Sequence, residues 1–298
     1  MIVVRLSGGM GNQMFQYALG RALSLRYNVP LSLDTTFLDH RIQMPKFLRP
    51  HFVFRKYDLD VFNVHAKIAE RNDIPSFWHR PISSGKLMLV IDALFRKFPL
   101  LRGWEKSFSY DEKILSLGPD TYLSGFWQSP KYFKGYEETI RNDFTLRKPL
   151  AEISKKIFDE IQNCQSVCVH VRRSDIAEKS FHGSADVSYY QKAIEYIAKQ
   201  KNIEKIFIFS DDDKWCRDNL TFDYPTVVVE ALHAGTKGEG HLALMSACKH
   251  FIIPNSTFSW WAAWLNTNSD KIVIAPKRWF SKGKIDIIDL IPEEWILL

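Results

Sequence analysis

The clearest chemical signal in the sequence is a doubled arginine at the end of an apolar run. Residues 166–171 read SVCVHV, and Arg172, Arg173, Ser174 and Asp175 follow directly. An arginine side chain presents a planar fork of N–H donors that fits two phosphate oxygens at once. The pattern predicts a buried strand that carries a phosphate-binding cation to its carboxyl end. The alternative is a surface ion pair between one arginine and Asp175.

The two arginines are not equivalent in this prediction. Neighbouring residues of a strand point to opposite faces of the sheet. We therefore expect one of Arg172 and Arg173 to meet the ligand and a local carboxylate to hold the other.

Three other polar clusters follow stretches that we expect to be strands. In an open parallel sheet the ligand lies at the carboxyl ends of the strands, so a cluster at such an end is a candidate binding site. Two of these clusters share one predicted sheet edge with the arginine pair. The three clusters are SGGMGNQ at 7–13, SDDD at 210–213 and NSTFS at 255–259.

In the NSTFS cluster, Ser256, Thr257 and Ser259 precede or open an apolar helix. Such residues commonly cap a helix, and the same hydroxyl and N–H groups also bind phosphate. Both interpretations stay open. Asn255 begins a glycosylation sequon, to which we give little weight in a chain that we expect to be cytoplasmic.

The SGGMGNQ cluster lacks the Lys-Ser/Thr ending of the triphosphatase loop and the acidic partner of a dinucleotide-binding fingerprint. We therefore do not interpret it as an ATP or NAD site. Its glycines, Gly9 among them, allow a close backbone approach to a ligand or a tight turn. The side chains of Asn12 and Gln13 look available for hydrogen bonds.

In the SDDD cluster, Asp211 and Asp213 have the spacing of a site for a divalent metal on a diphosphate. The alternatives are that Ser210 or Asp211 caps the next helix, or that a carboxylate contacts a base or ribose. We favour these alternatives over a metal.

Apolar strands and helices alternate along the chain, most regularly in its second half. Apolar strands separated by helices indicate a parallel sheet covered on both faces. We therefore expect an α/β protein of two halves, 1–155 and 156–298. The expected strands are 1–6, 30–34, from 122 to a turn at Ser129–Pro130, 166–171, 205–210, 225–230, 250–254 and 271–276; the expected helices are 14–28, 153–163, 188–200, 212–220, 240–248 and 256–266.

The bulk composition narrows the class of ligand. The chain has 298 residues, a net charge of +6 and a pI near 9.0, with basic residues spread along its length. This balance indicates a solvated basic surface or an anionic ligand, and a nucleic-acid-binding module is the non-enzymatic rival. The four cysteines have no CxxC spacing, so we expect reduced thiols and no zinc cluster. We also expect no signal peptide and no membrane span.

Taken together, HVRRSD, GGMGNQMFQYA and LMSACKHFIIPNSTFSWWAAWL resemble the bacterial α-1,2-fucosyltransferases of glycosyltransferase family 11. The matches run from residue 8 to residue 265 in the family's order. The resemblance implies a GT-B-like fold of two Rossmann-type halves with a cleft between them. It implies an acceptor-side domain at 1–155 and a GDP-fucose-binding domain at 156–298.

The resemblance also implies the reaction. The donor would be GDP-β-L-fucose, the acceptor the 2-hydroxyl of a terminal galactoside, and the transfer would invert the anomeric centre with no obligatory metal or other cofactor. The rival functions are another GT-B enzyme with a different sugar nucleotide and a metal-dependent transferase using Asp211 and Asp213. Peripheral contact with an anionic membrane is a further hypothesis from the basic charge.

Site residues follow from the resemblance position by position. Arg172 matches the arginine that contacts the donor diphosphate. Where relatives carry an acidic residue that reads guanine, this chain has His241, and Glu239 or Asp211 are the candidates to replace it. The remaining matches are His170 and Asp175 near the nucleotide, Ser256, Thr257 and Ser259 on the phosphate side, and Gly9, Asn12 and Gln13 in an N-terminal loop facing the cleft.

An inverting transfer benefits from a base that takes the acceptor's proton. Glu178 and Asp175, just past the arginine pair, are the candidates. Glu178 precedes Phe181 and His182, and this spacing resembles the α-1,6-fucosyltransferases, where a glutamate has that role.

Overall fold

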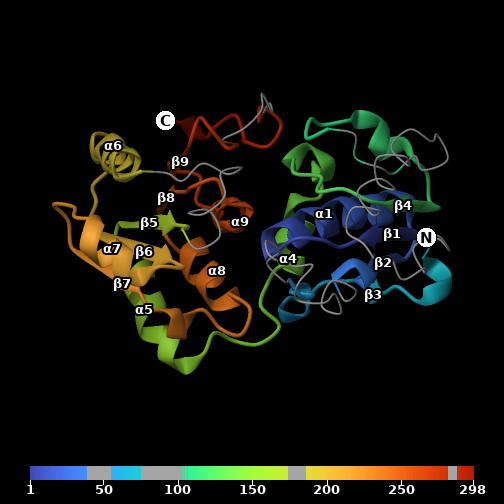
Figure 1. The fold of residues 1–298 in the computed structure, drawn as a ribbon, viewed down its shortest axis with the longest axis horizontal. Helices are drawn as coiled ribbons and strands as arrows, with labels where there is room; N and C mark the ends of the chain where they lie inside the picture. The colour runs from blue at the N-terminus through green and yellow to red at the C-terminus, as the bar shows by residue number, and fades with distance from the viewer. Residues whose placement is uncertain (39–54, 75–102, 104, 106, 174–185, 281–286) are drawn as a thin grey trace, which may run out of the picture. The chain divides into compact units, whose positions relative to one another are not determined.

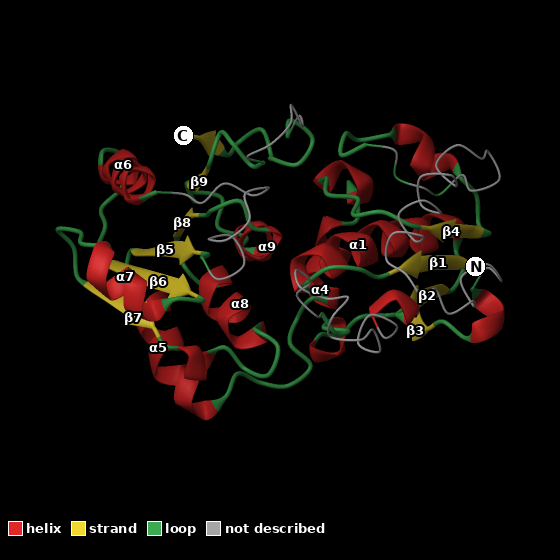
Figure 2. Ribbon diagram, in the orientation of Figure 1, coloured by secondary structure: helices red, strands yellow, loops and turns green. Residues whose placement is uncertain are grey.

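The structure is a computed structural model that describes residues 1–38, 55–74, 103, 105, 107–173, 186–280 and 287–298. Its contacts divide the chain into two compact units. Unit 1 is Met1–Thr145 with Asp286–Leu290, and unit 2 is Leu146–Ile285 with Ile291–Leu298. Each unit is built on its own parallel sheet (Figures 1 and 2).

The division between the units falls earlier than the boundary predicted at 155/156. Helix α5 (Glu152–Gln162) begins before that boundary and packs on helix α8 (Glu239–Ser246) of unit 2. Ser154 Oγ lies 3.1 Å from His233 Nδ1 and ties the helix to the same unit. The contacts of α5 therefore place all of it in unit 2.

Unit 1 contains a four-stranded parallel sheet in the order β3-β2-β1-β4. Helix α1 lies against β1 and β2, and a Cβ on Gly20 would stand 2.4 Å from Val4 Cγ2, so only glycine permits this approach. The strands are β1 Ile2–Arg5, β2 Leu31–Asp34, β3 Lys67–Ile68 and β4 Thr121–Leu123; the helices are α1 Met10–Tyr27 and α4 Glu137–Asp143, with 3-10 turns η2 Leu59–Val61, η3 Arg71–Asp73, η5 Glu112–Ser116 and η6 Pro130–Phe133.

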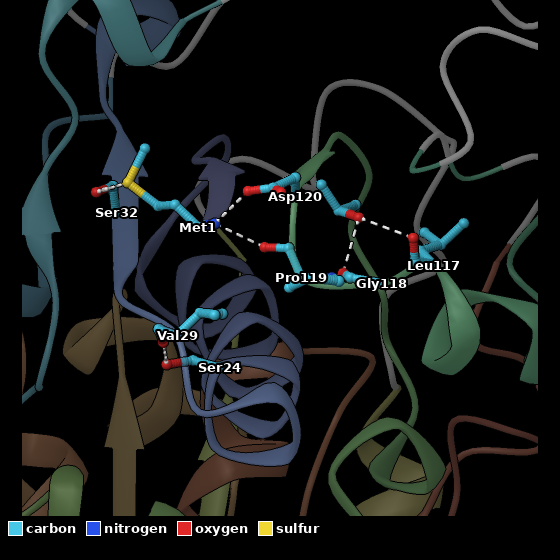
Figure 3. A network of polar contacts seen from close by, with 9 residues as sticks. Met1, Ser24, Val29, Ser32, Leu117, Gly118, Pro119 and Asp120 are labelled. Atoms are coloured by element: carbon cyan, nitrogen blue, oxygen red, sulfur yellow. Dashed lines mark hydrogen bonds and ion pairs between the residues drawn. The ribbon is translucent and has the colours of Figure 1, made fainter.

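Polar contacts join the amino ends of these strands (Figure 3). The Met1 ammonium donates to the Pro119 carbonyl at 2.7 Å and to Asp120 Oδ1 at 2.6 Å, just before β4. Ser32 Oγ of β2 lies 3.3 Å from Met1 Sδ, and Ser24 Oγ donates to the Val29 carbonyl at 2.5 Å. These contacts fasten the amino edge of the unit 1 sheet.

Unit 2 contains a six-stranded parallel sheet in the order β10-β9-β8-β5-β6-β7. Strand β5 is buried at every residue and pairs with both β6 and β8. The strands are β5 Ser166–Val171, β6 Lys205–Ser210, β7 Thr226–Val229, β8 His250–Ile252, β9 Val273–Ala275 and β10 Ile296–Leu297; the other helices are α6 Val187–Ala198, η7 Ala231–His233, α7 Asp213–Asn219 and α9 Thr257–Leu265.

Helices cover both faces of this sheet (Figure 2). Val167, Val169 and Val171 of β5 share a core with buried residues of α6 and with Cys216 of α7. The alternate residue His170 faces the other way, where its ring lies 6.0 Å from Phe258 of α9. This two-sided burial explains why β5 is apolar throughout.

The predicted strands at 166–171 and 205–210 are confirmed to the residue. The other expected strands and helices are present with shifted ends, and two-residue strands β3 and β10 were not expected. In the part of the chain that the structure describes, no helix is both long enough and apolar enough to cross a membrane.

Candidate functional site

The carboxyl edge of the unit 2 sheet gathers most of the polar residues that the sequence singled out. Strands β5, β6 and β8 are parallel neighbours, so the residues that follow them meet at one edge. His170 and Arg172 come from the end of β5, Asp211 from the end of β6, and Ser256 from the turn between β8 and α9.

His170 is a neutral, buried side chain. Its Nδ1 has no hydrogen-bond partner among the described residues, while its carbonyl accepts a bond from Tyr190 Oη at 3.2 Å. Burial and the positive charge of Arg172 lower the pKa of His170 to about 3, against the opposing effect of Asp211. The imidazole therefore carries no charge at neutral pH and can form one more hydrogen bond.

The structure distinguishes the two arginines. Arg173 Nε lies 3.7 Å from Asp212 Oδ2, and its guanidinium sits 4.0 Å from the centre of the Trp215 ring. The backbone N–H of Arg173 donates to Asp211 Oδ1 at 2.8 Å. Arg173 is therefore held by a local carboxylate, as expected for one of the two arginines, and the ligand contact of Arg172 stays a prediction.

Helix α9 begins at Ser256, whose backbone is extended and whose side chain makes no capping hydrogen bond. Ser256 is 1% exposed, and its Oγ has no partner among the described residues. Ser259 Oγ is used inside the helix, where it donates to the Ser256 carbonyl at 3.2 Å. Thr257 is the first helical residue and is half-buried.

Buried polar atoms without partners therefore collect around the start of α9. They are His170 Nδ1, Ser256 Oγ and Asn255 Oδ1. Each such atom costs about 1–3 kcal/mol when nothing satisfies it, and native proteins leave few of them. A polar ligand at this edge would supply the missing bonds.

The SDDD cluster has a structural role in large part. Asp212 caps α7 by accepting a bond from the Trp215 N–H at 3.0 Å. The prediction that Ser210 or Asp211 is the cap was wrong. Asp213 lies in the first turn of that helix. Within the described ranges, no group of three or more histidine, cysteine or carboxylate side chains could hold a metal ion.

Glu239 and His241 stand at the start of α8. Glu239 accepts N–H bonds from Thr236 at 3.0 Å and Lys237 at 2.7 Å. Burial opposes its ionisation, but these bonds prevail and lower the pKa of its carboxyl. Both carboxylate oxygens of Glu239 thus bind the preceding loop. This role makes Glu239 a weaker candidate for recognising guanine.

His241 is buried between the sheet and the chain that follows β7. Its Nε2 lies 3.1 Å from the Glu230 carbonyl, and its ring meets that of Phe209 edge-on at 5.5 Å. Burial lowers the pKa of His241, although the bond to Glu230 opposes the shift. With Nε2–H bound to the carbonyl, Nδ1 is the ring atom with a lone pair.

The glycine-rich loop lies in unit 1, at the start of α1. Gly8 has a left-handed backbone with φ of 77°, and Gly9 is the N-cap of the helix. Asn12 Oδ1 accepts a bond from Gln128 Nε2 at 3.0 Å, so its carbonyl oxygen already has a protein partner.

Gln13 is not available for a ligand, contrary to the prediction. Its side chain is fully buried, its Nε2 donates to the carbonyls of Gly8 and Lys56, and its Oε1 accepts from the Asp58 N–H at 2.9 Å. The amide holds a distant loop against α1, a contact that no local pattern could have shown.

The two candidate bases, Asp175 and Glu178, lie outside the described residues. Sequence reasoning also missed residues that the structure places at the two sheet edges. Phe258 packs on His170, and Asn255 exposes only 5% of its surface, which agrees with the little weight given to its sequon. In unit 1, the Glu105 carboxylate accepts the N–H groups of Phe126 and Trp127, and Trp127 has a left-handed φ of 55°.

Comparison with known proteins identifies the family. The model of glycosyl transferase family 11 matches residues 95–297, which is more than half of the chain. The chain belongs to glycosyl transferase family 11. It is therefore a glycosyltransferase, and the family expected from the three motifs is confirmed.

Family 11 relatives match the chain over different lengths. The α-1,2-colitosyltransferase of Escherichia coli is 34% identical over 99% of this chain and 98% of its own length. The O-antigen biosynthesis glycosyltransferase WbnK of E. coli is 30% identical over 98% and 99%. The galactoside α-(1,2)-fucosyltransferase 1 of Rattus norvegicus is 30% identical over 53% of this chain and 44% of its own.

Solved structures support the fold class. The fucosyltransferase NodZ from Bradyrhizobium has a TM-score of 0.51 and 17% identity, covering 88% of this chain and 90% of its own. A mutant of Arabidopsis thaliana FUT1 in complex with GDP has a TM-score of 0.52 and 11% identity, covering 98% and 74%. The α/β fold with two parallel-sheeted halves is GT-B-like, as predicted.

The lowered pKa of His170 predicts a pH dependence of stability. Because the folded pKa of about 3 lies below the ordinary value of 6.5, the unfolded chain binds the proton first, and stability falls as pH falls. Between about pH 7.5 and about pH 5.5, His170 should remove about 1.4 kcal/mol of unfolding free energy.

The measurement is urea unfolding of the wild type and His170→Asn at both pH values. The variant should lose about 1.4 kcal/mol less than the wild type over this interval, because the effects of the other histidines cancel in the difference. Equal losses in the two proteins would contradict a buried neutral imidazole.

Proposed function

We propose that this family 11 enzyme transfers L-fucose from GDP-β-L-fucose to the 2-hydroxyl of a terminal galactoside. The transfer inverts the anomeric centre and requires no metal. The observation that carries the proposal is the set of unsatisfied polar atoms at the start of α9, on the sheet edge where Arg172 follows β5.

The geometry of this edge suits a nucleotide diphosphate. When the sugar leaves, negative charge grows on the diphosphate oxygens, and fixed donors aimed at that charge lower the barrier. Arg172 supplies a guanidinium fork, and the N-terminus of α9 supplies backbone N–H groups and the Ser256 and Thr257 hydroxyls. Neutral His170 adds a polar contact without a competing charge.

Fucose as the transferred sugar rests on relatives. The rat relative is named a galactoside α-(1,2)-fucosyltransferase, and NodZ is a fucosyltransferase. A second candidate is a colitose nucleotide, because the E. coli α-1,2-colitosyltransferase matches nearly the whole chain at 34% identity. Colitose is fucose without its 3-hydroxyl, so both sugars fit the same class of site.

A mass-spectrometric transfer assay tests the donor and the metal together. Purified protein is mixed with lactose and with GDP-fucose, GDP-colitose, GDP-mannose or UDP-galactose, each with and without EDTA. We expect a deoxyhexosyl product from GDP-fucose that EDTA does not reduce. Product only from GDP-colitose would favour the second candidate, and loss of product in EDTA would favour a metal-dependent transferase.

Substitution of Arg172 tests the diphosphate contact. Arg172→Ala should lower kcat/KM by about 10²-fold or more, the usual effect of losing one oxyanion donor, and Arg172→Lys should recover part of the loss because it keeps the charge without the fork. Arg173→Lys is the matched control and should stay within a few-fold of the wild type, since Asp212 and Trp215 already hold that side chain. Wild-type turnover by Arg172→Ala would overturn the assignment.

The catalytic base is proposed to be Glu178 or Asp175. Removal of a general base costs about 10²–10⁴-fold in rate. We therefore expect Glu178→Gln or Asp175→Asn to lose kcat on that scale while calorimetry shows unchanged GDP affinity. If both variants keep near-normal kcat, neither carboxylate is the base.

A further inference from the structure

The three unsatisfied atoms at the start of α9 differ in what they can bind. Ser256 Oγ can donate or accept, and neutral His170 Nδ1 donates in one tautomer and accepts in the other. Asn255 Oδ1 is a carbonyl oxygen and can only accept. A ligand that reaches this atom must offer it an O–H or N–H donor.

The orientation of the Asn255 amide is fixed by a neighbour. Asn255 Nδ2 donates to the Trp279 carbonyl at 3.0 Å, beyond the end of β9. A flipped amide would set two carbonyl oxygens against each other, so the hydrogen-bond network requires the nitrogen at this position. Asn255 is 5% exposed and Trp279 is 3% exposed, so both residues are buried and the bond between them fixes the position of the Asn255 amide.

An ionised diphosphate cannot satisfy Asn255. At neutral pH its oxygens are almost all acceptors, and they would face another acceptor at Oδ1. The same edge therefore contains donors that suit phosphate and one acceptor that does not. A ligand group that satisfies Asn255 Oδ1 is therefore a hydroxyl or an N–H group.

We propose that Asn255 Oδ1 accepts a hydrogen bond from a hydroxyl group of the nucleotide sugar, on the ribose or on the transferred hexose. The proposal rests on the proposed function, because it takes a nucleotide sugar as the ligand of this edge. It makes Asn255 a residue that recognises sugar, set directly before the residues assigned to phosphate.

The experiment compares the affinities of two proteins for a small set of nucleotides. Calorimetry gives the Kd of wild type and Asn255→Ala for GDP, GDP-fucose, 2′-deoxy-GDP and 3′-deoxy-GDP. Loss of one hydrogen bond to a buried acceptor should weaken binding about tenfold. If the hexose supplies the hydroxyl, the variant loses affinity for GDP-fucose and keeps its affinity for GDP.

If the ribose supplies the hydroxyl, the variant loses affinity for GDP and GDP-fucose alike. In that case the wild type discriminates about tenfold against one deoxy-GDP, and the variant does not. Identical Kd values of the two proteins for every ligand would overturn the proposal and assign Asn255 Oδ1 to an internal water. A wild type that does not bind GDP would instead overturn the proposed function.

Asn266→Ala is the matched control at the other end of α9. Asn266 is half-buried, and its Nδ2 donates to the backbone carbonyls of Ser246 at 2.8 Å and Cys248 at 2.9 Å, so it too is an amide bound to backbone. Its loss should lower the melting temperature without changing any Kd. Should Asn255→Ala fail to fold, Asn255→Ser gives the same comparison, and the wild-type preference among the deoxy nucleotides tests the ribose hydroxyls without any variant.

Discussion

Everything at the unit 2 edge depends on how strand β5 is buried. β5 pairs with β6 on one side and β8 on the other, and each of its residues is buried. Its alternation sends Val169 and Val171 into the core beneath α6 and turns His170 toward α9. Because the backbone pairing fixes the position of the end of β5 at Val171, it also fixes the position of the next residue, Arg172.

The same constraint explains the unusual state of His170. Burial in the strand disfavours the charged imidazolium of His170, and the positive charge of Arg172 disfavours it further, so both lower its pKa. The side chain is therefore neutral, and it offers a hydrogen bond without adding a charge. Arg173 has a different environment, in which Asp212 Oδ2 lies 3.7 Å from its Nε and the Trp215 ring covers its guanidinium.

Sequence pattern predicted most elements of unit 2 because strands β5 and β6 are largely apolar and buried and helices α5 and α6 are amphipathic. It located β5 and β6 to the residue. The two-residue strands β3 and β10 were missed because so short a pairing leaves no periodicity to read.

The candidate site was predictable only where function depends on residue type and local order. The arginine pair at a strand end is such a case. The long-range contacts were not: the Gln13 amide bonds residues more than forty positions away, and the Asn255 amide bonds Trp279. These long-range contacts decide whether a polar side chain is available to bind a ligand or is used to hold the fold together. The local spacing of residues in the sequence carries no information about them.

This distinction separates the two helix starts that the sequence singled out, the glycine-rich one of α1 and the serine-containing one of α9. At the start of α1, Gln13 is satisfied on both sides of its amide, Asn12 Oδ1 is bound to Gln128, and the Ser7 N–H donates to Gln16 Oε1. At the start of α9, Ser256 Oγ and Asn255 Oδ1 are buried without partners among the described residues.

Native folds leave few buried polar atoms unsatisfied, and an ordered water, an ion or a ligand completes many of these. The polar side chains at the start of α1 therefore have a structural role, whereas those at the start of α9 retain hydrogen-bonding capacity for the proposed ligand. The mixture of donors and one strict acceptor at α9 suits a ligand that carries both anionic oxygens and hydroxyl groups. A nucleotide sugar offers both kinds of group in one small molecule, whereas the ionised phosphodiester of a DNA backbone offers only anionic oxygens.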